Sequence, residues 1–152
     1  MLSIAHAVTG AFIAANLPCP WIFAPLAFFS HFVLDHVYHY DAGVAMRDGH
    51  WRLFTTAIVA GLDLCLAAIL VAIFWRQSPT HFTWQIWLGA FFAILPDLIE
   101  SFELFFSHPL KIFQPLSRLH HRVHRSTSNI FFGLLPQVIL VAFIGIISLL
   151  NW

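Results

Sequence analysis

Long apolar stretches separated by short polar segments make up almost the whole chain. They cover residues 2–17, 20–40, 51–76, 82–106 and 128–150. A helix needs about 20 apolar residues to cross about 30 Å of hydrocarbon, and the stretches are close to that length. The stretch 2–17 is the shortest, so it either crosses the membrane or enters it and turns back. The pattern predicts an all-α, polytopic membrane bundle of four to five transmembrane helices, which forms a single domain over residues 1–152.

The composition agrees with a membrane protein. Hydrophobic residues make up 60% of the chain and charged residues only 9%, which is more apolar than a soluble domain needs for one core. Tryptophan rings favour the headgroup level of a bilayer. The tryptophans lie near the ends of the proposed helices, at Trp21, Trp51, Trp75, Trp84, Trp87 and Trp152.

Lysine and arginine are distributed unequally between the two sides of the predicted bundle. If all five stretches cross, the N-terminus and the segments 41–50 and 107–127 share one side. That side carries Arg47, Arg52, Lys111, Arg118, Arg122 and Arg125, whereas the other side carries only Arg76. Because positive residues stay in the cytoplasm, we expect a cytoplasmic N-terminus. The formal net charge is +0 with neutral histidine, so the charge does not favour nucleic acid as a partner.

Ionisable side chains gather in the cytoplasmic half of the predicted bundle. In SHFVLDHVYHYD, the spacing i, i+4, i+8 places His31, Asp35 and His39 on one stripe of the second helix. At 1.5 Å per residue, His31 would lie about 14 Å deep and Asp35 about 8 Å deep. Other segments bring further groups to the same half, namely His6, Asp97, Glu100, His120, His121 and His124. Ionisable residues inside a membrane are costly and commonly mark functional sites.

The clustered histidines and carboxylates are typical ligands of a divalent metal ion. Neutral imidazole and carboxylate bind Zn²⁺, and they also bind Mn²⁺ or Fe²⁺. Such an ion would balance carboxylates that hydrocarbon alone would force to take up protons. A bound water with a lowered pKa could attack an ester or phosphoester, while Arg122 or Arg125 holds an anionic phosphate. The predicted metal ligands are His31, Asp35, Asp97, His124, His6 and Glu100.

The same residues also allow a purely structural interpretation. His31 and Asp35 could form a hydrogen-bonded pair that fixes helix packing. Asp97 could cap the half-helix that follows the preceding proline. We expect His36 and His39 at the membrane interface rather than among the ligands.

Two further polar features fall outside this set. Asp63 lies in the middle of an apolar stretch, where we expect it to reach the site or to line a polar gap. Ser126, Thr127 or Ser128 is expected to cap the last helix. The free backbone N–H groups of that helix start would then favour an anion beside Arg125.

Three short motifs resemble those of a known family. LPDLIE, RVHRSTSN and SHFVLD are similar to the L-P-D-x-D-H, H-R-G-x-T-H-S and S-H-x-x-x-D patterns of the bacterial inner-membrane metal-dependent hydrolases, the LexA-binding, inner-membrane-associated family. The resemblance implies that His31 and Asp35 are metal ligands and that His124 and Arg125 form the H-R pair. HFVLDH is also similar to the H-x-x-x-D-H stretch of the zinc-dependent phospholipases C.

The sequence favours a membrane-embedded, metal-dependent hydrolase of a lipid or phosphoester at the cytoplasmic face of a bacterial inner membrane. Asp97 and Arg125 are the predicted catalytic residues, and zinc is the favoured ion, with manganese or iron as alternatives. The expected partners are membrane lipid and other membrane proteins, without nucleic acid. Two other classes stay open: a small accessory subunit of a membrane complex whose histidines bind haem, pigment or lipid, and an oxidative lipid enzyme with a histidine box such as HHRVH.

Overall fold

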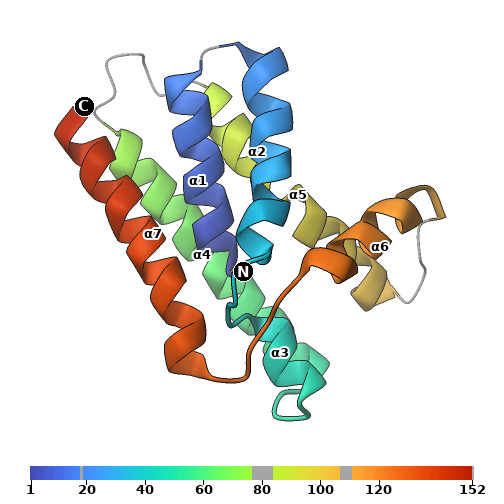
Figure 1. Ribbon diagram of the computed structural model, residues 1–152. Coiled ribbons are helices and arrows are strands. Elements are labelled where there is room, and N and C mark those ends of the chain that lie inside the picture. The colour runs from blue at the N-terminus through green and yellow to red at the C-terminus, as the bar shows by residue number, and fades with distance from the viewer. Residues whose placement is uncertain (18, 77–83, 107–110, 152) are drawn as a thin grey trace.

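Most of the described chain is helical. The computed structural model describes residues 1–17, 19–76, 84–106 and 111–151. The helices are α1 (Ser3–Asn16), α2 (Pro20–Asp35), α3 (Ala42–Arg47), α4 (Leu53–Trp75), α5 (Trp84–Phe106), α6 (Gln114–Val123) and α7 (Ile130–Asn151), with a short 3-10 helix, η1 (Lys111–Phe113), before α6 (Figure 1). The predicted all-α class is confirmed for this part of the chain.

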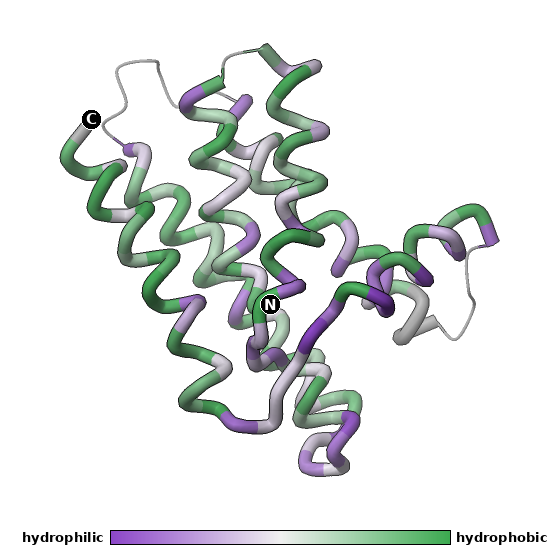
Figure 2. Tube along the Cα trace, viewed as in Figure 1, coloured by the Kyte–Doolittle hydropathy of each residue, from purple (hydrophilic) through white to green (hydrophobic). Residues whose placement is uncertain are grey.

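Among the described helices, α4, α5 and α7 are long and apolar enough to cross a membrane, over Leu53–Trp75, Trp84–Phe102 and Ile130–Leu150. Figure 2 shows long hydrophobic stretches along α4 and α7, whereas hydrophilic residues gather in α6 and in the connection from α6 to α7. α1 and α2 contain 14 and 16 residues, so they are about 21 Å and about 24 Å long. The structure therefore supports an integral membrane protein with three candidate spans in its described part.

α2 ends at Asp35, well before the end of the predicted apolar stretch. The chain beyond it is extended and pairs with the connection between α6 and α7. The N–H of His39 donates to Arg125 O at 3.2 Å, and the N–H of Thr127 donates to His39 O at 2.8 Å, in an isolated parallel bridge. These long-range bonds use backbone groups that a longer helix would need. The prediction that His31, Asp35 and His39 share one stripe of a single helix is therefore wrong.

α1 lies at the centre of the bundle, with packing against α2, α4, α5 and α7. Its crossing with α5 is close because small residues face each other there. A Cβ at Gly10 would overlap Gly89 O and lie 2.6 Å from the Cβ of Ala93, and a Cβ at Gly89 would lie 2.6 Å from the Cβ of Ala14. Small residues at such a crossing let two backbones approach closely.

Side chains from other helices hold the N-terminal end of α1. The Ser3 N–H donates to Asp63 Oδ2 at 2.6 Å, and the Ile4 N–H donates to Asp63 Oδ1 at 3.4 Å. The Leu2 N–H donates to Gln137 Oε1 at 2.8 Å. Asp63 of α4 thus caps the first turn of α1, which satisfies N–H groups that a helix start leaves unpaired. This cap accounts for an aspartate in the middle of an apolar helix.

The same cap fixes the height at which α1 begins. Asp63 follows Leu53, the first residue of α4, by ten positions, which corresponds to about 15 Å along the helix axis. The Met1 amino group in turn contacts Asp35 at the end of α2. The N-terminal end of α1 and the C-terminal end of α2 therefore lie near the middle of α4.

The first prediction concerns the crossing of α1 and α5. Gly10→Ala should destabilise the protein by about 1 to 3 kcal/mol, because the added methyl group overpacks the contact with Gly89 and Ala93. Thermal unfolding in detergent measures the effect. Gly61→Ala is the matched control, since a Cβ at Gly61 meets nothing within 4 Å and alanine favours a helix. Equal unfolding temperatures for the two variants would contradict the close packing.

The second prediction concerns the cap from α4. Asp63→Ala should cost about 1 kcal/mol of stability, because the N–H groups of Ser3 and Ile4 lose their acceptor. Asp63→Asn should retain most of that stability, since asparagine also caps helices. Denaturant or thermal unfolding of both variants tests this. If Asp63→Asn were as unstable as Asp63→Ala, the negative charge of Asp63 rather than its capping hydrogen bonds would account for its effect on stability.

Candidate metal centre

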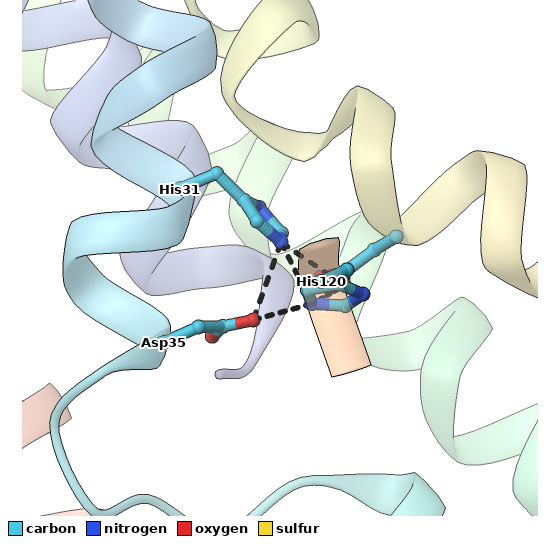
Figure 3. Close-up of side chains that lie close together, drawn as sticks. His31, Asp35 and His120 are labelled. Carbon is cyan, nitrogen blue, oxygen red and sulfur yellow. Dashed lines mark hydrogen bonds and ion pairs between the residues drawn. The ribbon is translucent and has the colours of Figure 1, made fainter. Parts of the chain in front are cut away.

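Four side chains from three helices converge on one point beside the end of α2. His31 and Asp35 project from successive turns of α2 toward His120 of α6 (Figure 3). His31 Nε2 lies 3.3 Å from Asp35 Oδ2, 3.2 Å from His120 Nε2 and 3.4 Å from Asp97 Oδ1. His120 Nε2 lies 2.6 Å from Asp35 Oδ2. Tetrahedral ligands with bonds of about 2.0 to 2.1 Å are about 3.4 Å apart, so most of these separations are close to those of a metal site.

The imidazoles of the cluster are oriented through their second nitrogen. His31 Nδ1 lies 2.8 Å from Ala93 O, and His120 Nδ1 lies 2.6 Å from Glu100 Oε2. A carbonyl or carboxylate oxygen accepts a hydrogen bond, so each Nδ1 carries a hydrogen and each Nε2 faces the centre of the cluster. Metal-binding histidines commonly have this arrangement, in which a backbone carbonyl or carboxylate fixes the ring. Glu100 is therefore placed as a partner of His120 rather than as a ligand.

His6 of α1 completes the buried side of the cluster. Its ring is fully buried and stacks on His31, with ring centroids 4.0 Å apart. Its Nε2 lies 3.2 Å from Asp35 Oδ1 and 3.9 Å from Asp97 Oδ2. Among the described residues, neither ring nitrogen of His6 has a hydrogen-bond partner. Buried polar atoms are rarely left unpaired, so a cation between His6 and the two carboxylates would fit this position.

His120 and Asp41 show that the site favours positive charge. Burial alone would lower the pKa of His120, but its contacts with Asp35 and Glu100 outweigh burial and raise that pKa to about 10. Burial alone would raise the pKa of Asp41, yet the nearby rings of His124 and His39 hold it well below its usual range. A proton or a metal ion can supply the positive charge at each position.

A second group of ligand atoms adjoins the first one. Asp35, His39 and His124 offer atoms that lie within 4.8 Å of one another. His39 is fully buried and belongs to this possible ligand group, against the expectation that it is not a ligand, whereas His36 is exposed. The backbone bridge to the α6–α7 connection turns His39 inward. His124, a predicted ligand, belongs to this second group rather than to the first.

A polar cavity of about 330 Å³ opens beside both groups. Its wall includes ionisable side chains from five segments, namely Asp41, Arg47, Asp63, Asp97, Glu100 and His124. Asp97 keeps about 26% of its side chain exposed, so it stands between the buried ligands and the cavity. A small polar substrate would reach the site through this space.

Arg125 contributes its backbone to the site and directs its side chain elsewhere. Its N–H donates to Asp35 O at 2.8 Å. Its guanidinium carbon lies 5.9 Å from the centroid of the exposed Tyr38 ring, and Arg125 does not line the polar cavity. Arg47 of α3 does line it, and its guanidinium donates to Ser126 Oγ at 2.6 Å.

The cap of α7 also differs from the predicted one. Asn129 Oδ1 accepts from the Phe132 N–H at 3.1 Å, and Thr127 Oγ1 accepts from the Asn129 N–H at 3.2 Å. Ser128 instead donates to Asp48 Oδ2 at 2.6 Å. Asn129 therefore caps α7, and its side chain occupies a donor that the predicted anion site beside Arg125 would have used.

The structure brings together His31, Asp35, Asp97 and His6 as predicted neighbours, and it adds His120, His39 and Asp41. The spacing i, i+4 of His120 and His124 in HHRVH was a signal that both face one side of a helix end. No local signal identified Asp41. The i, i+4, i+8 spacing included His39, but a bridge to a distant segment rather than a continuous helix places it.

Comparisons with protein-family models, curated proteins and solved structures found no match to this chain. The resemblance to the inner-membrane hydrolases therefore stays a prediction that depends on the three motifs.

Proposed function

We propose that the protein is a membrane-embedded, metal-dependent hydrolase. His31, Asp35, Asp97 and His120 would hold a divalent ion, with His6 as a further ligand. The observation that carries this proposal is the orientation of His31 and His120. Each has its Nδ1 occupied by an oxygen atom, and the two Nε2 atoms face each other at 3.2 Å. Asp35 Oδ2 lies 2.6 Å from the same His120 nitrogen, so a proton or a metal ion lies among these atoms, and a divalent ion would bind all of them at once.

The ligand types favour zinc, with manganese or iron as alternatives. Two imidazoles and two carboxylates suit each of these ions. A divalent ion at this point supplies a Lewis acid and lowers the pKa of a bound water. Asp97 would position a water in the cavity and accept its proton, because its side chain is partly exposed on the cavity wall.

A phosphate-bearing substrate fits the cavity better than a neutral one. Arg47 contributes a guanidinium to the cavity wall, and its bond to Ser126 holds that group in place. A guanidinium binds phosphate oxygens with two parallel hydrogen bonds. We therefore assign to Arg47 the role that the sequence indicated for Arg125.

A lipid is the favoured carrier of that phosphate. Leu2 lines both the polar cavity and an apolar groove of about 460 Å³ whose other walls come from α1, α4 and α7. A lipid headgroup would enter the cavity while its acyl chain follows the groove. This arrangement matches an amphiphilic substrate taken from the membrane itself.

The proposed setting is a bacterial inner membrane. α4, α5 and α7 would cross it, and α1 and α2 would form a helical hairpin within it, for a bundle of four to five membrane helices. Arg47 and Arg52 precede α4 and Lys111 follows α5, which favours a cytoplasmic location for these helix ends and for the N-terminus.

The geometry disfavours a haem or pigment subunit. His31 and His120 present their Nε2 atoms 3.2 Å apart, and His39 and His124 present theirs 3.0 Å apart. A flat macrocycle between two axial histidines needs more space than either gap leaves. Purified protein without visible absorbance would agree with the hydrolase proposal.

The third prediction concerns the metal content. Protein purified in detergent without chelator should contain at least about one equivalent of zinc, manganese or iron by elemental analysis. His31→Ala combined with Asp35→Ala should remove it, whereas His36→Ala should not, because His36 is exposed and points away from the site. Wild-type protein with less than about a tenth of an equivalent would contradict the metal centre.

The fourth prediction concerns the phosphate contact. Arg47→Ala should leave the metal content intact and lower turnover of a phospholipid-type substrate about tenfold or more, which corresponds to about 1.4 kcal/mol of transition-state stabilisation. Arg118→Ala is the control, since Arg118 is exposed on α6. The same assay on Arg125→Lys tests separately whether Arg125, the residue that the sequence indicated, contacts the phosphate. Unchanged turnover in Arg47→Ala would remove Arg47 from the site.

A further inference from the structure

Asp35 lies between two pairs of histidines. Its Oδ2 faces His31 Nε2 at 3.3 Å and His120 Nε2 at 2.6 Å, which belong to the proposed metal centre. Its Oδ1 contacts the Met1 amino group and faces His6 Nε2 at 3.2 Å and His39 Nε2 at 3.6 Å. His124 Nε2 lies 3.9 Å from Oδ2. Asp35 is fully buried, so both oxygens need partners with positive charge or protons.

The second pair of histidines converges like the first. His39 Nε2 and His124 Nε2 lie 3.0 Å apart. His39 Nδ1 lies 2.8 Å from Val37 O, so Nδ1 carries a hydrogen and Nε2 faces the other members of this group. The His39 ring is therefore fixed for metal binding by a backbone carbonyl, as His31 is by Ala93.

Asp41 closes this second group from the cavity side. Its Oδ2 lies 3.3 Å from both His39 Nε2 and His124 Nε2. That oxygen is buried and has no hydrogen-bond partner within the described ranges. Ring nitrogens of His39 and His124 and carboxylate oxygens of Asp41 and Asp35 thus converge on one point. A cation at their centre would give the Asp41 oxygen a partner.

We propose that Asp35, His39, Asp41 and His124 bind a second divalent ion and that the Asp35 carboxylate bridges the two ions. This inference rests on the proposed hydrolase function and narrows its substrate to a phosphoester. Paired ions about 3.5 to 4 Å apart are typical of enzymes that cleave phosphoesters, because they stabilise both the attacking and the leaving oxygen. The polar cavity, with Arg47 on its wall, adjoins both ligand groups.

Metal stoichiometry of the detergent-purified protein tests the second ion. Zinc-loaded protein, freed of excess zinc, should contain about two equivalents by elemental analysis, and His39→Ala and Asp41→Asn should each contain about one. His36→Ala is the matched control and should keep about two. Circular dichroism and gel filtration establish that each variant is folded, and Asp41→Asn serves as a conservative change if His39→Ala fails to fold.

A spectroscopic readout tests whether the two ions are neighbours. Manganese-loaded wild-type protein should give an electron paramagnetic resonance spectrum with spin coupling through the shared carboxylate. In His39→Ala this spectrum should become that of an isolated ion. Two equivalents of manganese without coupling would contradict the bridging role of Asp35.

The measured metal contents distinguish a failure of the proposed function from a failure of the second ion alone. Wild-type protein that binds no metal would overturn the proposed function and the second ion together. Wild-type protein with about one equivalent, retained in His39→Ala, would overturn only the second ion. About two equivalents in both the wild-type protein and His39→Ala would show that the second ion has other ligands and would overturn the ligand set proposed here.

Discussion

The buried carboxylate of Asp35 is the contact on which the rest of the site depends. A carboxylate without solvent, inside an apolar bundle, costs several kcal/mol unless partners compensate its charge. Five segments supply those partners: the Met1 amino group, His6 of α1, His31 of α2, His39 of the extended segment and His120 of α6. Removal of Asp35 would therefore leave imidazoles from separate helices without a common acceptor.

Packing and capping contacts outside the site hold these partners in position. The close crossing of Gly10 and Gly89 brings α1 against α5, and Asp63 holds the first turn of α1 at the middle of α4. As a result His6 enters the cluster from one side and Asp97 from another. Asp63 illustrates how a carboxylate within an apolar helix can have a structural role while it also lines a polar cavity.

The sequence predicted those parts of the structure that depend on local pattern. Hydrophobic length located α4, α5 and α7, and the spacing of His31 and Asp35 placed them on one face of α2. The end of α2 could not be predicted, because backbone bonds between His39 and a segment more than eighty residues away determine it. The direction of the Arg125 side chain likewise depends on Tyr38, which the motif RVHRSTSN does not include.

The carboxylates of the site lie inside an apolar bundle, so their negative charges need positive charges close by. Asp35, Asp41, Asp63, Asp97 and Glu100 bring five carboxylates into or beside one cavity next to α4. The Met1 amino group, Arg47 and a protonated His120 supply positive charge here, and a divalent ion bound by His120 would take the place of its proton. A buried carboxylate in a low-dielectric bundle needs a nearby positive charge to stay ionised, whether an amino group, an imidazolium or a metal ion supplies it.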